Sequence, residues 1–341
     1  MSLKRSPLGK TGLLFPPIVF GSSYLGNLYR VLSREEKRAI VDSWFQCVDP
    51  PVAIDTANKY GAGLALESIG SLLKERGVSP SDVIISNKLG WARRPLRGPE
   101  PTFEPGVWAG LNHDAEQVIG YEGMWECWEQ SLDLLNGYTP ALLAVHDPDE
   151  YLAAASSESD RARRWEHLLQ AFEALAEMKK KGLIRGVGVG AKDYRVIAEI
   201  DAAVPLDWAM FACSYTLFFH PPEVVRLMER MANKGIGIIN SAIFHGGFLT
   251  GGDYFDYRRL SRDNPEDARL YSWRDRFFEL CNRYEVSPAA AATQYGFRGP
   301  GIVAIALNSS KPEKVKRNMD LLTESIPETF WEELKALEPC E

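Results

Sequence analysis

Four residues with a shared chemical purpose stand close to short apolar runs of the chain. Asp55, Lys88 and His146 each end such a run, and Tyr60 follows Asp55 in the segment Asp-Thr-Ala-Asn-Lys-Tyr-Gly. A free tyrosine has a pKa of about 10, and a neighbouring ammonium lowers it. We expect Lys88 to supply the ammonium, Asp55 to hold it, and His146 to hydrogen-bond a reacting oxygen. The set predicts acid–base chemistry at Tyr60.

Each of these residues also has a structural explanation when taken alone. Asp55 is compatible with a loop cap, Lys88 with a solvated side chain and His146 with a hydrogen-bonded core histidine. Their placement at the ends of three consecutive apolar runs favours the joint chemical interpretation.

Short apolar segments alternate with amphipathic ones along the chain, a pattern that predicts strands alternating with helices. The expected strands are residues 17–20, 52–55, 83–87, 141–146, 184–189, 208–213, 236–240 and 302–306. The expected helices are residues 34–47, 65–75, 124–135, 161–181, 194–203, 223–234, 272–284 and 312–322. Eight alternations predict an α/β fold, a (β/α)₈ TIM barrel forming one domain over residues 1–341.

An open doubly wound sheet is the rival architecture, and it requires a GxGxxG motif after an early strand. The glycine-rich run at 186–190 follows the fifth strand instead. In a barrel the strand ends converge on one mouth, so Asp55, Lys88 and His146 should meet there, with Tyr60 over them. Long segments at 91–121 and 241–271 follow the third and seventh strands, and we expect them to cover this mouth or to form surface loops.

The composition argues against several kinds of binding partner. A net charge of −7 argues against nucleic acid. Five cysteines without a CxxC spacing argue against a disulfide framework or a zinc cluster, and no metal site is expected. The N-terminus lacks the apolar region of a signal peptide and no long apolar run occurs, so we expect a cytoplasmic protein without a membrane partner. The oligomeric state is not indicated.

These motifs resemble those of the aldo-keto reductase family over nearly the whole chain. The matching segments are Leu8-Gly9-Lys10-Thr11-Gly12, Gly21-Ser22-Ser23, residues 55–61, Ser131-Leu132-x-x-Leu135, residues 181–188, and Lys311-Pro312-Glu313-Lys314-Val315 with Asn318. The resemblance implies a barrel with an N-terminal β-hairpin that binds NAD(P)(H) in an extended pose. It also implies that Asp55, Tyr60, Lys88 and His146 form a catalytic tetrad, with Tyr60 the general acid in reduction and the general base in oxidation.

The resemblance assigns further residues to the cofactor. Tyr215 matches the aromatic residue that stacks on the nicotinamide, the alternative being an aromatic of the barrel wall. Residues 241–249 match the loop around the pyrophosphate, where Gly246 and Gly247 make backbone amides accessible to an anion; His245 either contacts phosphate or lies at the surface. The expected contacts are Gly21, Ser22, Ser23, Asp55, Gly190, Ala191, Tyr215, Ser241, Gly246, Gly247, Leu249, Ser309, Lys314 and Asn318.

Two positions depart from the family pattern. Gly190-Ala191 stands where the family has the Ser-Asn pair that holds the nicotinamide carboxamide, which leaves backbone groups, Lys192 or Asp193 as replacements. Asn308 stands where NADP-preferring members have a lysine, which weakens a 2′-phosphate site. Lys311, Lys314 and Arg317 are compensating cations, or simply a solvated helix start. The expected cofactor is NAD or NADP, with NAD favoured.

Within the family, the chain is most similar to the L-fucose and D-threo-aldose 1-dehydrogenase group. That similarity implies oxidation of the anomeric hydroxyl of an aldose to a lactone, with Trp91, Trp108 and Tyr254 as aromatics that pack on the sugar or within the protein. The main alternative is an NADPH-dependent aldehyde or ketone reductase that acts on a carbonyl substrate. A non-catalytic, cofactor-sensing subunit is a second alternative. A metal-dependent hydrolase is disfavoured because, of five histidines, only His146 clearly ends a strand.

Overall fold

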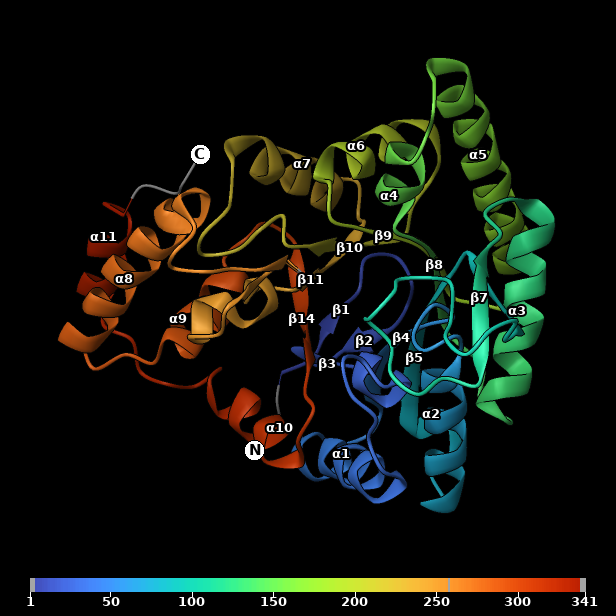
Figure 1. Ribbon diagram of the computed structural model, residues 1–341, viewed down its shortest axis with the longest axis horizontal. Helices are drawn as coiled ribbons and strands as arrows, with labels where there is room; N and C mark the ends of the chain where they lie inside the picture. The colour runs from blue at the N-terminus through green and yellow to red at the C-terminus, as the bar shows by residue number, and fades with distance from the viewer. Residues whose placement is uncertain (1–3, 257, 338–341) are drawn as a thin grey trace.

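Eight parallel strands close into a barrel in the computed structural model, which describes residues 4–256 and 258–337 (Figure 1). The barrel strands are β3 (Ile18–Gly21), β4 (Val52–Ala57), β5 (Val83–Leu89), β8 (Leu142–His146), β9 (Gly186–Ala191), β10 (Trp208–Ala212), β11 (Gly237–Ser241) and β14 (Ile302–Asn308). They pair in chain order, and β14 returns to pair with β3. Every strand expected from the sequence is present, so the predicted (β/α)₈ architecture is confirmed.

Helices surround the barrel, and several begin at a residue whose side chain caps the helix. The helices are α1 (Arg34–Cys47), α2 (Leu64–Glu75), α3 (Tyr121–Leu135), α4 (Pro148–Ala153), α5 (Glu158–Lys180), α6 (Tyr194–Ala203), α7 (Pro222–Asn233), α8 (Ala268–Arg283), α9 (Pro288–Gly296), α10 (Pro312–Asp320) and α11 (Glu328–Leu334). At α1, for example, Ser33 and Glu36 form a reciprocal capping box, and Ile40 and Trp44 are buried. Of these eleven helices, α4, α9 and α11 were not predicted.

The helix that packs against the barrel between β11 and β14 is α9, whereas the sequence pointed to residues 272–284 as the connecting helix. A methyl group built on Gly296 of α9 would lie 3.0 Å from Ile305 in β14. The predicted segment does form a helix, α8, but it packs farther out, where Phe277 shares an apolar cluster with Phe330 of α11 (Figure 1). The start of α9 is Pro-Ala-Ala-Ala-Ala, and small side chains allow close packing without an amphipathic signature.

Glycines in β9 make room for large side chains inside the barrel. A Cβ atom on Gly188 would lie 2.3 Å from the Trp208 ring, and one on Gly190 would lie 3.1 Å from Cδ of Lys88. The run at 186–190 is therefore a packing feature of an inward strand face. Below this layer, the antiparallel strands β1 (Ser6–Pro7) and β2 (Leu14–Phe15) form the predicted N-terminal hairpin, and Leu8 and Phe15 complete the apolar core cluster that contains Trp208.

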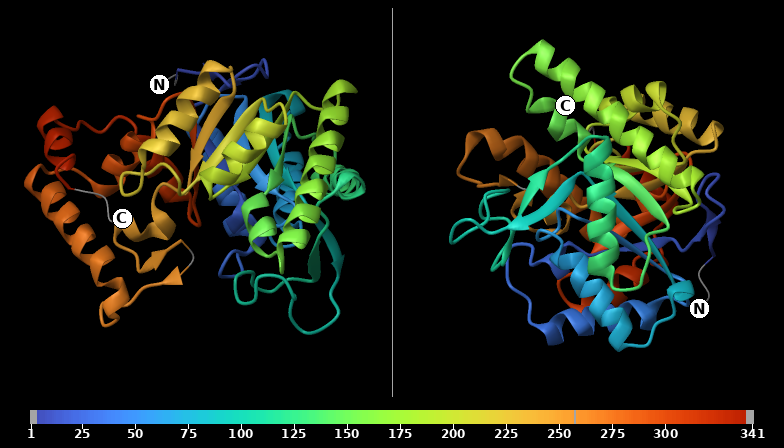
Figure 2. Two further views of the ribbon diagram at one scale, coloured as in Figure 1. Left: turned by 90° about the horizontal axis from the view of Figure 1, so that it is seen from above. Right: turned by 90° about the vertical axis from the view of Figure 1, so that its right-hand side faces the viewer.

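Two insertions lie at the end of the barrel opposite the N-terminal hairpin (Figure 2). The first follows β5 and contains the antiparallel strands β6 (Trp91–Pro95) and β7 (His113–Gln117). The second follows β11 and contains the 3₁₀ segment η3 (His245–Thr250) and the strands β12 (Tyr254–Phe255) and β13 (Arg258–Arg259). The predicted long loops after the third and seventh strands are thus confirmed, and both stand at the mouth where the carboxyl ends of the strands converge.

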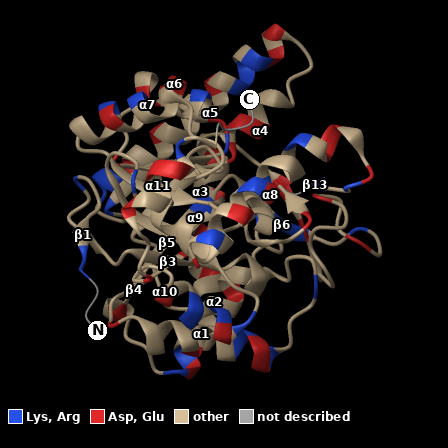
Figure 3. Cartoon of the chain, turned by 90° about the vertical axis from the view of Figure 1, so that its left-hand side faces the viewer, with Lys and Arg blue, Asp and Glu red and all other residues tan. Residues whose placement is uncertain are grey.

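The surface carries both signs of charge. On the side of the molecule drawn in Figure 3, Lys and Arg alternate with Asp and Glu along the outer helices, while the barrel strands are uncharged over most of their length. None of the helices in the described part of the chain has the length and apolar character needed to cross a membrane. The four cysteines among the described residues are free thiols.

Candidate active site

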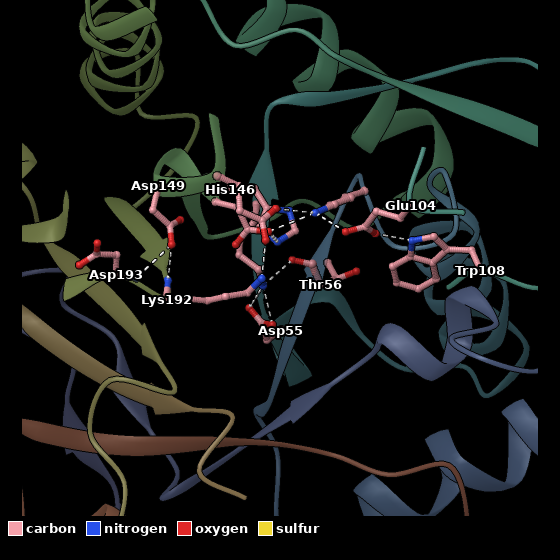
Figure 4. A network of polar contacts seen from close by, with 12 residues as sticks. Asp55, Thr56, Glu104, Trp108, His146, Asp149, Lys192 and Asp193 are labelled. Atoms are coloured by element: carbon pink, nitrogen blue, oxygen red, sulfur yellow. Dashed lines mark hydrogen bonds and ion pairs between the residues drawn. The ribbon is translucent and has the colours of Figure 1, made fainter. Parts of the chain in front are cut away.

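Asp55 and Lys88 form a buried ion pair at the barrel mouth (Figure 4). Lys88 Nζ lies 2.7 Å and 2.6 Å from the two carboxylate oxygens of Asp55 and also donates to the Thr56 carbonyl at 3.2 Å. Both side chains point inward from neighbouring strands. Ala57 of β4 pairs with Lys88 of β5, and Asp55, two residues before Ala57, has its side chain on the same face of the sheet. Burial raises the pKa of Asp55, and the Lys88 ammonium opposes that rise. The pair keeps a positive charge fixed beneath Tyr60.

Tyr60 lies over this pair, in the loop after β4. The Lys88 ammonium is 5.1 Å from the centre of the Tyr60 ring, and the ring of His146 meets Tyr60 edge-on at 5.6 Å. Burial raises the pKa of Tyr60 well above 10, and the Asp55 and Asp147 carboxylates act in the same direction. This direction is opposite to the one expected from the sequence. The reason is that Asp55 balances the charge of Lys88, so burial of the phenol dominates.

His146 ends β8 and is buried beside the phenol. Burial, reinforced by the Lys88 and Lys59 ammonium groups, lowers the pKa of His146 well below 6.5. The imidazole is therefore neutral near neutral pH and carries one N–H donor. Its Nδ1 is buried and has no hydrogen-bond partner among the described residues. Its Nε2 lies 3.4 Å from Oδ2 of Asp147.

A buried cation next to Tyr60 was missed by the sequence analysis. The Lys59 side chain is only 5% exposed, and its Nζ lies 2.6 Å from Glu104, 3.2 Å from Asp147 and 3.3 Å from Glu150. Burial alone would lower the pKa of Lys59, but the three carboxylates together raise it above its usual value. Lys59 thus ties the loop that carries Tyr60 to the insertion after β5 and to the segment after β8.

Gly190 and Ala191 occupy the position expected to bind the nicotinamide carboxamide, and neither has a polar side chain. Lys192 pairs with Glu150, and the Asp193 carboxylate caps α6 through the Arg195 N–H and binds the Arg195 guanidinium. Asp149 accepts hydrogen bonds from the backbone N–H groups of Lys192 and Asp193 through one oxygen. Its other oxygen is buried and has no partner in the described part of the chain.

Tyr215 packs against α9. Its ring stacks on Tyr295 of α9 at 5.7 Å, it is only 5% exposed, and its backbone carbonyl accepts a hydrogen bond from Asn240 at 2.9 Å. The ring therefore packs between β10 and α9, and its contact with Tyr295 was not expected because α9 itself was not predicted.

The loop after β11 carries two glycines in the left-handed region, but the N–H groups of Gly247 and Leu249 both donate to the Phe244 carbonyl. Gly246 and Gly247 adopt φ of 68° and 98°, and a side chain on Gly246 would press on the Tyr254 backbone at 3.1 Å, whereas the position of Gly247 is open. The Leu249 side chain is fully buried in an apolar cluster and its N–H donates to Phe244, so Leu249 is not available to a phosphate. Ser241 is buried, and its hydroxyl donates to Phe211.

Residues predicted for the adenosine end come together where β3, β14 and α10 meet. Asn308 donates to the hydroxyl of Ser23, and a Cβ atom on Gly21 would lie 3.1 Å from Asn308. Asn318 of α10 donates to the Ser309 hydroxyl at 3.1 Å. Lys314 is exposed on the outer side of this helix start.

These residues fit a dinucleotide bound across the mouth. Ser22, beside Asp55, is 1% exposed, and its hydroxyl has no hydrogen-bond partner within the described residues. A buried hydroxyl without a hydrogen-bond partner destabilises the folded protein unless a ligand or water molecule bonds to it. It lies between the tetrad and the cluster of Ser23 and Ser309, the course expected for the cofactor.

The aromatics of the two insertions serve mainly to pack the loops. Trp108 lies between Tyr60 and Phe103, at ring distances of 5.8 Å and 6.5 Å, and its indole N–H donates to Glu104. Trp91 packs on Phe103 and under the Lys59 ammonium. Tyr254 remains 42% exposed and meets Tyr29 across the mouth at 5.9 Å.

Similarity to known proteins identifies the family of this chain. Residues 17–339 match the Aldo/keto reductase family. The chain is 28% identical to pyridoxal 4-dehydrogenase of Microbacterium luteolum, over 98% of both chains, and 26% identical to D-threo-aldose 1-dehydrogenase of a Pseudomonas species, over 98% and 97%. Its fold is similar to that of the glycerol dehydrogenase AKR11B4 from Gluconobacter oxydans, with a TM-score of 0.71 at 17% identity over 99% and 95% of the two chains. The holo form of the aldo-keto reductase AKR11C1 from Bacillus halodurans gives a TM-score of 0.70 at 20% identity over 98% and 96%. The chain belongs to the aldo/keto reductase family and is an oxidoreductase.

Proposed function

We propose that this enzyme is an NAD(P)-dependent sugar 1-dehydrogenase that oxidises the anomeric hydroxyl of an aldose, of the L-fucose type, to a lactone. The observation that carries the proposal is the position of Tyr60 above the Asp55–Lys88 pair and beside a neutral His146. All four residues belong to one barrel, which we take to be a single catalytic domain spanning residues 1–341.

In the proposed reaction the aldose loses a proton from its anomeric hydroxyl and a hydride from the anomeric carbon. The bound nicotinamide supplies the hydride acceptor. His146 donates an N–H to the substrate oxygen and orients it toward Tyr60. Tyr60, as phenolate, accepts the proton, and Lys88 stabilises the negative charge that the phenolate carries before transfer. Asp55 holds Lys88 in place.

Residues at the mouth provide the groups to hold the dinucleotide. We assign the phosphate-binding role to the loop backbone at Gly246 together with Ser22, and the adenosine end to Ser23, Ser309 and Asn318. Because Asn308 replaces a lysine, we propose NAD as the preferred cofactor. The free thiols suit a reducing compartment such as the cytoplasm.

The similarities support a sugar as the substrate. The relatives include D-threo-aldose 1-dehydrogenase and the L-galactose dehydrogenase of Arabidopsis thaliana, the latter at 22% identity over 93% of this chain and 87% of that protein. Both are named for oxidation of a sugar.

One observation favours a second function, an NADPH-dependent aldehyde or ketone reductase. The raised pKa of Tyr60 keeps the phenol protonated near neutral pH. A protonated phenol is the form required of a general acid, which donates its proton to the carbonyl oxygen.

Steady-state rates separate the two functions. The purified enzyme is assayed with L-fucose and a panel of aldoses with NAD⁺, and with a simple aldehyde and NADPH. The proposal requires a higher kcat/KM for at least one aldose. A clear preference for the aldehyde over every aldose would replace it with the reductase assignment.

A further inference from the structure

Three side chains that commonly bind transition metals meet beneath the loop after β11. The Cys213 thiol lies 3.1 Å from Oδ1 of Asp256, and Nδ1 of His245 lies 2.9 Å and 3.0 Å from the two oxygens of Asp256. The sulfur, nitrogen and carboxylate oxygen all lie within 4.8 Å of one another. The residues come from three separate segments, namely the turn after β10, the start of η3, and the turn between β12 and β13.

The backbone is unusual at all three positions. Cys213, His245 and Asp256 adopt φ of 59°, 47° and 45°, in the left-handed region that side-chain-bearing residues rarely occupy. Such conformations cost free energy and concentrate at sites where a side chain must be aimed for a purpose. Here the three left-handed residues direct their side chains to one point.

The remaining face of His245 is arranged as in a metal-bound histidine. Nε2 lies 2.8 Å from the Thr216 hydroxyl, which is also 3.4 Å from the Phe219 carbonyl. In this structure Nδ1 lies at donating distance from the Asp256 carboxylate. On metal binding the proton would move to Nε2, where the Thr216 hydroxyl, which also accepts from the Phe219 N–H, can accept it, and the Nδ1 lone pair would become available to the ion. Histidines that bind metals usually donate their other N–H to an oxygen in this way. The His245 ring is also stacked flat on Phe255 at 4.6 Å, which fixes its plane.

We propose that Cys213, His245 and Asp256 bind a divalent transition-metal ion of the Zn²⁺ type, with water as the fourth ligand. Thiolate, imidazole and carboxylate are the three protein donors that zinc prefers. Coordination breaks the thiol S–H bond and releases its proton to solvent, so the two resulting negative charges match the charge of the cation. Bond lengths of about 2.0–2.3 Å place tetrahedral ligand atoms roughly 3.3–3.8 Å apart. The Asp256 carboxylate would therefore move a few tenths of an ångström away from the thiol and the imidazole, which already lie within 4.8 Å of each other.

The bound ion would connect the turn after β10, the loop after β11 and the β12–β13 hairpin. The same loop carries Gly246 and Gly247, which adjoin His245. The ion would therefore fix the hairpin against the glycine pair of the predicted cofactor loop, apart from the tetrad and without a part in its chemistry. This site was not predicted from the sequence, because the three ligands are far apart along the chain and form no recognised spacing.

The test is a titration of untagged, chelator-treated protein with Zn²⁺ by calorimetry and with Co²⁺ by absorption. We expect one ion per chain, a thiolate-to-Co²⁺ charge-transfer band and a higher melting temperature with Zn²⁺. Cys213→Ser should abolish the band and weaken Zn²⁺ binding at least about tenfold, and Thr216→Val should weaken it by about tenfold through His245. Cys47→Ser, which changes a thiol on α1, is the matched control and should bind like the wild type.

Circular dichroism of each variant without metal separates a loss of binding from a loss of fold, and Asp256→Asn provides a third variant that keeps the size and hydrogen-bonding capacity of the side chain. Absence of one-to-one binding to the wild-type protein would overturn the proposal. Equal binding by the wild type and a folded Cys213→Ser would do the same, since it would place the ion elsewhere.

Discussion

The ammonium of Lys88 hydrogen-bonds both carboxylate oxygens of Asp55 and lies 5.1 Å from the centre of the Tyr60 ring. The positive charge of Lys88 therefore interacts both with the Asp55 carboxylate, which neutralises it, and with Tyr60, whose phenolate form it would stabilise. Burial raises the pKa of the phenol, and the Asp55 carboxylate raises it further. This relationship determines the pH dependence expected of the enzyme.

Sugar oxidation should accelerate with rising pH. The pKa of Tyr60 lies well above 10, so the phenolate fraction rises about tenfold per pH unit below that pKa. The sign follows because oxidation needs the deprotonated base, whereas reduction needs the phenol and should fall only above the same pKa. The measurement is kcat/KM for an aldose from about pH 6 to pH 10. A plateau beginning near neutral pH would show that Lys88 dominates over burial.

Alanine substitutions at Gly188 and Gly190 of β9 should have different effects, one on stability and the other on activity. Gly190→Ala places a methyl group 3.1 Å from Cδ of Lys88 and should shift its ammonium, reducing kcat by about tenfold with little loss of stability. Gly188→Ala places one 2.3 Å from the Trp208 ring and should destabilise the barrel by about 1–3 kcal/mol. Denaturation and kinetics of both variants test the pair. Loss of stability in both, with activity of the folded fraction unchanged, would contradict the role given to Gly190.

Lys59 should be required for the stability of the mouth. Lys59→Met removes the cation that Glu104, Asp147 and Glu150 share. Glu150 keeps its ion pair with Lys192, and the loss of the buried Lys59 is expected to cost about 3 kcal/mol. Lys316→Met, which removes an exposed ion pair with Asp320, is the control and should leave the free energy of unfolding nearly unchanged. Chemical denaturation measures both, and a Lys59→Met/Glu104→Gln double variant should recover part of the loss. Equal effects of the two lysine substitutions would show that the Lys59 network has no special role.

The barrel was predictable because its strands are continuous apolar runs, and the tetrad was predictable because Asp55, Lys88 and His146 end three of them. The role of Lys59 was not predictable, because a lysine beside Tyr60 in a polar loop gives no sign that it is buried. Its partners Glu104 and Asp147 come from distant parts of the sequence. The packing of Tyr215 was equally hidden, since its partner Tyr295 lies on a helix of small residues. The raised pKa of Tyr60 depends on burial and on the geometry of the Asp55–Lys88 pair, which residue types alone do not specify.

The cofactor preference should depend on position 308. Wild-type protein is expected to bind NAD⁺ more tightly than NADP⁺, because Asn308 offers no positive charge to a 2′-phosphate. Asn308→Lys should tighten NADP⁺ binding about tenfold through one charge-assisted hydrogen bond. Fluorescence titrations with both dinucleotides measure this, and Lys314→Gln tests whether that exposed cation contributes. Tighter NADP⁺ binding by the wild type, lost in Lys314→Gln, would reverse the preference.

The most direct test of the central claim is the Tyr60→Phe variant, assayed for aldose oxidation and for dinucleotide binding in parallel. Removal of one hydroxyl should lower kcat by about 10²–10⁴-fold, the usual contribution of a general acid or base, while the Kd for the dinucleotide stays within about threefold of the wild-type value. An unchanged kcat in a correctly folded Tyr60→Phe enzyme would contradict the assignment of proton transfer to Tyr60.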